Sequence, residues 1–207
     1  MTRLYTGSAA ALVSALLGAT AYYVLLAPRA DDPYAECRTS VVSGGPETIG
    51  GPFTLVDQTG ATVTNTEVIA KPALIYFGYA SCTDVCPLDN VRNAEAADIL
   101  EEQGYEVTPV FISVDPGRDT PTVMADYVSR MHPRMIGLTG TEAQVKTATS
   151  AYRVFAKLDP AEGKDYPVDH STFTYLVLPD KGFVEFFRRE ATADEVAGKV
   201  GCFLQNT

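Results

Sequence analysis

Basic side chains are scarce in this chain. It has 16 lysines and arginines against 26 aspartates and glutamates in 207 residues, which gives a formal net charge of −10. A nucleic-acid partner requires a basic face to meet its phosphate backbone, so this composition argues against nucleic-acid binding. The same charge gives no reason to expect the globular part to bind anionic lipid.

Charged side chains are absent altogether from Leu4 to Pro28. As a helix this stretch would be ~36 Å long, which is enough to cross a hydrocarbon core of ~30 Å. A cleaved signal peptide is the alternative, but its apolar core is usually shorter, and Ala-Pro-Arg after Leu26 makes a poor cleavage site. We therefore expect residues 1–28 to hold a short cytoplasmic start and an uncleaved transmembrane helix.

The flanks of this segment predict its orientation. Arg3 and the amino terminus precede the span, which favours a cytoplasmic N-terminus and a globular part on the other side. The short N-terminus lacks an Arg- and Ser-rich transit segment, so we expect a bacterial inner membrane with the domain in the periplasm. Prolines and glycines interrupt residues 29–51, which predicts a flexible tether ahead of a domain over residues 52–207.

Strands and helices alternate through this domain. The sequence predicts a hairpin over residues 53–64, buried strands over 73–79 and 107–115, a second hairpin of strands over 172–178 and 183–187, and helices over 87–104, 121–131, 141–152 and from 192 onward. No internal repeat interrupts this order. Strand-helix-strand units followed by an antiparallel hairpin predict an α/β fold, a mixed sheet with helices on both faces.

Two cysteines, Cys82 and Cys86, lie where the first buried strand gives way to a helix. Residues four apart share one face of a helix, and the helix N-terminus favours thiolate over thiol. Such a pair either holds a soft metal ion or cycles between dithiol and disulfide. A structural disulfide is the third reading, but the loop it would close is too small to gain much. A redox-type cysteine pair at a strand-to-helix junction is typical of the thioredoxin-like fold, so we expect that fold here.

Two other metal chemistries lack the residues they need. Haem attachment requires Cys-x-x-Cys-His, which is absent. A structural zinc site takes four protein ligands, and only His132 is left to be the fourth. We expect His132 to be a surface or helix-cap residue instead.

Four motifs occur in order along the domain: Cys82-Thr-Asp-Val-Cys86-Pro, Val114-Asp-Pro-Gly-Arg-Asp-Thr-Pro121, Ile136-Gly-Leu-Thr-Gly-Thr141 and Val168-Asp-His-Ser171. With these motifs the chain resembles the Sco/SenC family over about residues 51–204. That family comprises membrane-tethered thioredoxin-like proteins that help deliver copper to the binuclear copper centre of cytochrome c oxidase. The resemblance implies a copper ion as cofactor, the oxidase copper-site subunit as a partner, and a periplasmic copper donor.

The resemblance also implies a ligand set, namely Cys82, Cys86 and His170, with Asp115 in the place of the family's acidic residue. From the residues alone, His170 would be a polar loop residue and Asp115 a turn former. Two thiolates and one imidazole suit Cu(I). For Cu(II) the set leaves room for a weaker fourth ligand, for which Asp84 and Asp115 are the candidates.

Cys37 and Cys202 lie outside these motifs. If the domain is exported, two exposed free thiols are not expected, because such compartments are oxidising. We therefore predict a structural disulfide between them that fastens the tether to the last helix.

The leading functional prediction is a membrane-anchored copper chaperone. The alternative is a thiol–disulfide reductase that keeps the copper-site cysteines of the oxidase reduced, with His170 only tuning the thiolate. A peroxiredoxin-like peroxidase shares the fold and is least favoured, because no separate Thr-x-x-Cys site is obvious.

Overall fold

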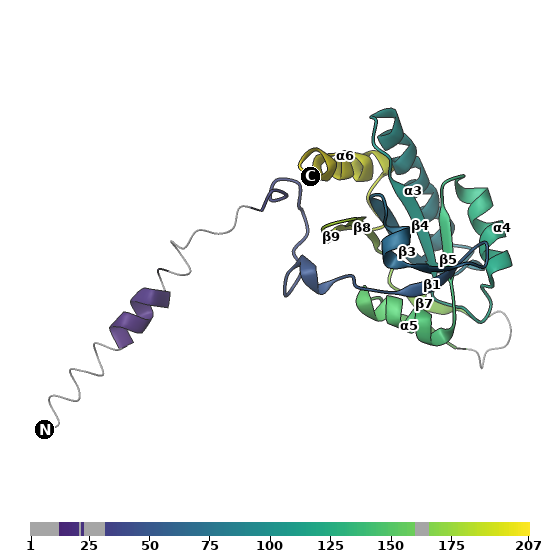
Figure 1. The fold of residues 1–207 in the computed structure, drawn as a ribbon, viewed down its shortest axis with the longest axis horizontal. Coiled ribbons are helices and arrows are strands. Elements are labelled where there is room, and N and C mark those ends of the chain that lie inside the picture. The colour runs from purple at the N-terminus through teal and green to yellow at the C-terminus, as the bar shows by residue number, and fades with distance from the viewer. Residues whose placement is uncertain (1–12, 21, 23–31, 160–165) are drawn as a thin grey trace, which may run out of the picture. The chain divides into compact units, whose positions relative to one another are not determined.

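The computed structural model describes residues 13–20, 22, 32–159 and 166–207. The chain divides into two units, Met1–Ala35 and Glu36–Thr207, and the second holds the sheet (Figure 1). In the first unit, residues 13–20 are helical, and most of the predicted anchor over residues 1–28 lies outside the described residues. Among those described, no helix is both long and apolar enough to cross a membrane.

A seven-stranded mixed sheet forms the centre of the second unit, in the order β2-β1-β5-β4-β3-β8-β9. β4 runs parallel to β3 and β5, whereas the outer pairings are antiparallel. The predicted hairpins are confirmed as β1–β2 and β8–β9. The strands are β1 (Thr54–Asp57), β2 (Thr62–Thr64), β3 (Ala73–Gly78), β4 (Thr108–Ser113), β5 (Ile136–Thr139), β8 (Thr174–Leu178) and β9 (Gly182–Phe187).

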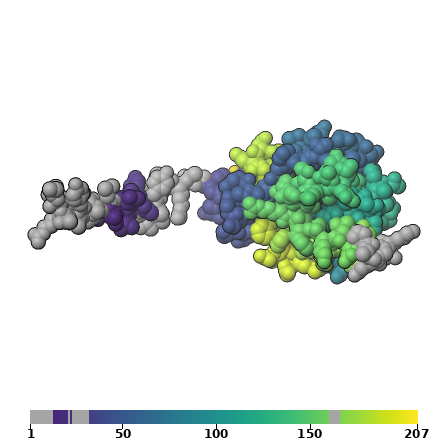
Figure 2. Space-filling model, turned by 90° about the horizontal axis from the view of Figure 1, so that it is seen from below, coloured from purple at the N-terminus to yellow at the C-terminus, as the bar shows by residue number. Residues whose placement is uncertain are grey.

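Helices cover both faces of this sheet, as the sequence predicts. They are α2 (Asn65–Val68), α3 (Val85–Glu102), α4 (Pro121–Met131), α5 (Glu142–Ala151) and α6 (Ala193–Gln205), with a short 3-10 turn η1 (Pro46–Thr48) ahead of them. In Figure 1, α3 and α6 lie on one side of the sheet and α5 on the other. The space-filling view shows the green segment that holds α5 covering much of the face turned toward the reader (Figure 2).

The fully buried strand β3 explains why both faces need helices. Side chains alternate between the faces of a strand. Tyr76 packs with Cys86 and Phe111 in one apolar cluster, whereas Ile75 and Phe77 belong to the other, which includes residues of α5. The apolar run that predicts a central strand therefore contributes side chains to an apolar cluster on each face of the sheet.

Side-chain caps set the starts of three helices. Thr192 and Glu195 form the predicted capping box at α6, since the Glu195 amide donates to Thr192 Oγ1 at 3.2 Å and the Thr192 amide to Glu195 Oε2 at 2.8 Å. Thr141 caps α5 in the same way, and Thr120 caps α4 ahead of Pro121. α3 begins at Val85, earlier than predicted, because Pro87 falls in the first turn, where its missing N–H costs nothing.

Three strands are present that the sequence does not predict. β5 lies between β1 and β4 in the main sheet, and β6 (Ala156–Leu158) pairs with β7 (Val168–His170) in a separate two-stranded sheet. Each has only three or four residues. Such lengths are too short for an alternating pattern to stand out, so these strands depend on their neighbours.

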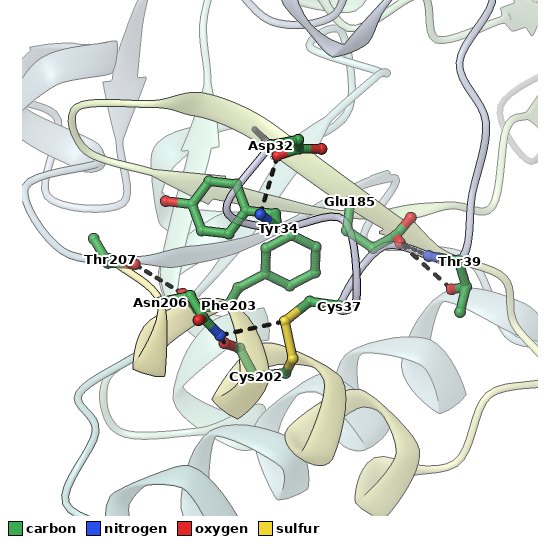
Figure 3. Close-up of a disulfide and its surroundings, with 9 residues drawn as sticks. All are labelled: Asp32, Tyr34, Cys37, Thr39, Glu185, Cys202, Phe203, Asn206 and Thr207. Carbon is green, nitrogen blue, oxygen red and sulfur yellow. Dashed lines mark hydrogen bonds between the residues drawn. A yellow bond between two sulfur atoms is a disulfide. The ribbon is translucent and has the colours of Figure 1, made fainter. Parts of the chain in front are cut away.

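Part of the predicted tether is bonded to the domain. The structure pairs Cys37 with Cys202 of α6 in a disulfide, with their Cα atoms 5.6 Å apart (Figure 3). Glu185 of β9 is fully buried, and its carboxylate accepts hydrogen bonds from the Thr39 amide at 2.8 Å and the Ser40 amide at 3.3 Å. The chain from Cys37 to Ser40, which we call the strap, is thus held to both β9 and α6.

Candidate metal centre

Three potential metal ligands converge at one end of the sheet. Cys82 Sγ, Cys86 Sγ and His170 Nε2 belong to a group whose ligand atoms all lie within 4.8 Å of one another. Cys86 Sγ is 3.3 Å from His170 Nε2, although 84 residues separate them in sequence. Both cysteines are free thiols. The structure therefore brings together the three side chains that the resemblance implies.

The sulfur half of the site is placed by β3 and α3. Cys82 lies in the turn that follows β3, and Cys86 is in the first turn of α3, where its amide donates to Cys82 Sγ at 3.4 Å. Gly78 ends β3, and a Cβ atom there would lie 2.9 Å from Cys86 Sγ and 2.9 Å from the Phe111 ring. A glycine at position 78 therefore lets Cys86 pack directly against the end of the strand.

The imidazole is fixed in orientation by its own neighbour. His170 Nδ1 lies 2.9 Å from the Ser171 carbonyl oxygen. A carbonyl can only accept, so Nδ1 carries the proton and Nε2 presents a lone pair toward Cys86. The rings of Tyr76 and Tyr79 meet the imidazole edge to face, with centroids 6.1 and 5.7 Å away. Burial lowers the pKa of His170, which favours the neutral, ligand-competent ring.

The two thiols have opposite tendencies to ionise. Burial raises the pKa of Cys86, which is fully buried. Burial also opposes ionisation of Cys82, but hydrogen bonds from the Cys86 thiol and from the amides of Cys86 and Asp84 outweigh it and lower the pKa of Cys82. Cys82 is therefore the thiol that forms a thiolate first.

A loop after β4 supports the sulfur half. Asp119 is 1% exposed, and its Oδ2 accepts hydrogen bonds from the Ala80 amide at 3.0 Å and from Ser113 Oγ at 2.6 Å. It thereby joins the turn that carries Cys82 to the end of β4. From the sequence no role at this site is predicted for Asp119, although its place in the Val114–Pro121 motif is the available signal.

The two predicted acidic candidates lie outside the group of three. Asp115 is fully buried, but its carboxylate forms an ion pair with Arg118 and accepts from the Tyr166 hydroxyl at 2.7 Å. Asp84 is exposed at the N-cap of α3. Within the described residues neither joins Cys82, Cys86 and His170, so a fourth ligand from either stays a prediction.

His132 is a cap, as predicted, but it is not on the surface. It ends α4 with only 7% of its surface exposed, because its Nε2 contacts Asp98 Oδ1 at 3.0 Å and its Nδ1 accepts from the Arg134 amide at 3.1 Å. Of the two alternatives predicted for His132, a surface or a helix-cap residue, the structure confirms the cap. His132 is not in the group formed by Cys82, Cys86 and His170.

This donor set defines what the site can do. Two sulfurs and one imidazole nitrogen form a soft, three-coordinate set, which suits Cu(I) better than a hard cation. The same two sulfurs can also exchange with a disulfide.

A family model described as SCO1/SenC matches residues 42–205. The chain belongs to the SCO1/SenC family. The SenC protein of Rhodobacter capsulatus is 50% identical over 197 residues, which cover 95% of this chain and 88% of that protein.

Solved structures of the family have the same fold. A crystal structure of Arabidopsis thaliana ScoI with copper bound matches with a TM-score of 0.71 at 40% identity, covering 76% of this chain and 99% of that one. BsSco, described with a disulfide switch as a member of the Sco family of cytochrome c oxidase assembly proteins, matches at 22% identity with a TM-score of 0.60, over 76% of this chain and 95% of that one. The chain thus has the thioredoxin-like Sco fold, as the sequence predicts.

Proposed function

We propose that this protein binds copper through Cys82 Sγ, Cys86 Sγ and His170 Nε2. The observation that carries the proposal is the approach of these three ligand atoms to within 4.8 Å of one another. The neutral imidazole has its Nε2 lone pair available, and Cys82 is disposed to lose its proton. The copper-bound structure of a family member at 40% identity supports the same chemistry.

The copper is carried to the copper centre of cytochrome c oxidase. This part of the proposal rests on the family, in which BsSco is described as an oxidase assembly protein. Residues 1–28 anchor the chain in a bacterial inner membrane, and a periplasmic donor supplies the ion. The Cys37–Cys202 disulfide is consistent with an oxidising compartment. Anchoring keeps the domain near a membrane-bound client and raises its effective concentration.

A Cu(I) competition titration of the purified chain, with Cys82 and Cys86 reduced, tests the ligand set. We expect one tightly bound equivalent. His170→Ala should weaken binding by more than about 100-fold, because loss of a supporting residue alone typically costs about 10- to 100-fold.

The chain's other histidine provides the control. His132→Gln should leave copper affinity unchanged, since His132 contacts Asp98 and Arg134 instead of the sulfurs. Equal affinities for His170→Ala and the unaltered chain would remove the imidazole from the site.

One observation favours the reductase as a second function, namely the opposite pKa shifts of the two thiols. The Cys82 thiolate would attack a client disulfide, break its S–S bond and form a mixed disulfide. Cys86 would then lose its proton and attack Cys82 Sγ, releasing the client as a dithiol and leaving Cys82–Cys86 oxidised.

Reduction of a disulfide peptide from the oxidase copper site separates the two functions. If Cys82→Ser abolishes this reduction while His170→Ala leaves both reduction and copper affinity intact, the reductase is the main function. If His170→Ala removes copper binding, the chaperone is supported, and residual reduction shows that both chemistries use one pair.

A further inference from the structure

His170 does not belong to the main sheet. It ends β7, which in the described part of the chain pairs with β6 alone, in the register Ala156↔His170 and Leu158↔Val168. The ladder that fixes β3, and with it the sulfur half of the site, does not include β7. The imidazole contacts the Phe77 backbone and the rings of Tyr76 and Tyr79, and further contacts place the β6–β7 hairpin that carries it.

Tyr166, two residues before β7, supplies such contacts. Its hydroxyl donates to Asp115 Oδ1 at 2.7 Å, and its carbonyl oxygen accepts from Arg118 Nη1 at 3.0 Å. The Arg118 guanidinium also lies over its ring, with Cζ 3.8 Å from the centroid. Three different groups of one residue are thus bonded to the loop between β4 and α4.

The same loop also holds the sulfur half. Asp119 accepts from the Ala80 amide, which leads into Cys82. Arg118 Cζ lies 5.5 Å from the centroid of Tyr79, whose ring meets His170 edge to face. Residues 115–119 therefore contact both segments that must meet at the ion.

Asp115 is the centre of this arrangement. Its carboxylate is fully buried and shared between Arg118 and the Tyr166 hydroxyl. A buried carboxylate with both partners in place stabilises a defined geometry, whereas loss of one partner leaves a buried charge poorly compensated. Its place in the structure is therefore that of a bridge between two loops.

We propose that Asp115, Arg118 and Tyr166 are positioning residues that hold the β6–β7 hairpin so that His170 Nε2 meets Cys86 Sγ. This inference rests on the proposed copper function. In this proposal the three residues affect Cu(I) binding by positioning His170 and not by contacting the ion.

Tyr166→Phe is the sharpest test, because it removes one hydroxyl and keeps the ring that stacks on Arg118. Cu(I) affinity should fall about 10-fold, the lower end of the effect expected for a residue that orients a ligand. Tyr105→Phe is the matched control, because Tyr105 is half-buried and precedes β4 at the end of the sheet away from Gly78. The Cu(I) affinity of this variant should equal that of the unaltered chain. An unchanged affinity in Tyr166→Phe would overturn the proposal.

A double-mutant cycle separates positioning from general destabilisation. In the His170→Ala background, Tyr166→Phe should have no further effect on copper affinity, because the ligand it positions is gone. The thiolate-to-Cu(II) absorption bands should persist in Tyr166→Phe, while nitrogen coupling in the electron paramagnetic resonance spectrum weakens. A 10-fold loss that persists without His170 would show a purely structural role.

Hydrogen exchange in the copper-free chain makes the inference independent of metal binding. The Ser171 amide donates to the Phe155 carbonyl at 3.0 Å, and it should exchange faster in Tyr166→Phe than in Tyr105→Phe. Faster exchange would support the positioning role even if the unaltered chain failed to bind copper, a result that would reject only the proposed function. Equal exchange in both variants would overturn the inference.

Discussion

At the scale of single residues, the site depends on two sulfur atoms whose surroundings differ. Cys82 is 8% exposed and receives hydrogen bonds from the start of α3, whereas Cys86 is fully buried against Gly78. One thiol is thereby disposed to ionise and the other to remain protonated until a partner or an ion replaces its proton. The asymmetry arises because Cys82 lies in the turn ahead of α3, whereas Cys86 lies in the first turn of α3.

Alkylation of the reduced, metal-free chain should report this difference. Because the pKa of Cys82 is lowered, its reaction rate should rise with pH to a midpoint below that of a free thiol. Burial raises the pKa of Cys86, so Cys86 should be alkylated more slowly than Cys82 near neutral pH. Pulsed iodoacetamide labelling followed by peptide mass analysis measures both rates. Equal rates for the two cysteines would contradict the assignment.

Gly78 leaves room for the packing of Cys86 because it has no side chain. In Gly78→Ala the new Cβ would lie 2.9 Å from both Cys86 Sγ and the Phe111 ring, so one of them must move. We expect a loss of about 1–3 kcal/mol in the free energy of unfolding, together with weaker Cu(I) binding, measured by urea unfolding and competition titration. Gly198→Ala in α6, where no atom lies within 4 Å of the new Cβ, should instead be neutral or stabilising.

At the scale of elements, the site is assembled where a strand, a helix and a separate hairpin meet. The loop between β4 and α4 links them, since Asp119 reaches the turn after β3 and Arg118 reaches Tyr166. Neither the main sheet nor α3 alone brings the three ligand atoms together. The loop is therefore as much a part of the site as the elements that carry the ligands.

Asp119→Ala tests the support given by this loop to the sulfur half. It removes the acceptor of the Ala80 amide and the Ser113 hydroxyl, and leaving such buried donors unpaired should cost about 1–3 kcal/mol of unfolding free energy. The control is Asp126→Ala on α4, whose ion pair with Arg130 is exposed and worth at most about 1 kcal/mol. Urea unfolding compares the two. Equal losses would show that Asp119 has no special role.

The sequence predicts the elements that carry strong local patterns. The apolar run of β3, the hairpin of β8 and β9, and the Thr192 capping box are all where the pattern places them. β6 and β7 are missed because three residues each give no periodicity, and their pairing is decided by tertiary contacts. Local propensity therefore accounts for the main sheet and fails for the hairpin that carries His170.

The candidate site divides in the same way. Cys82 and Cys86 follow from spacing at a strand-to-helix junction, which is local information. His170 has no such signal, and only the resemblance to a family identifies it. The bridging contacts of Asp115, Arg118 and Tyr166 join segments 48 and 51 residues apart, so no sequence pattern indicates them.

At the scale of the whole molecule, the Cys37–Cys202 disulfide links residues 165 apart in sequence. Almost the entire domain lies within the loop that it closes. Because such a cross-link mainly restricts the unfolded chain, its effect is spread over the domain instead of one contact. The buried bonds of Glu185 to Thr39 and Ser40 hold the same strap locally.

Cys202→Ser should therefore lower the free energy of unfolding by about 2–5 kcal/mol. Cys37→Ser should give the same loss, and the double variant should be no less stable than either single one, because all three lack one and the same bond. Urea unfolding at fixed pH measures the series. A double variant that unfolds at the same urea concentration as the unaltered chain would show that the disulfide contributes nothing.

The domain holds one disulfide, Cys37–Cys202, and one pair of free thiols, Cys82 and Cys86. This combination restricts which reductant could keep the free pair reduced. Once Cys82 and Cys86 bond to each other, neither can offer a lone pair to an ion, so loading must wait for an electron donor. That donor must reduce a Cys82–Cys86 disulfide without reducing Cys37–Cys202, since loss of the second bond would break the covalent link between the strap and α6. Under the proposed function, a reductant must therefore select one of the two cysteine pairs, and its access to the surface beside His170 would set how often Cys82 and Cys86 are free to bind copper.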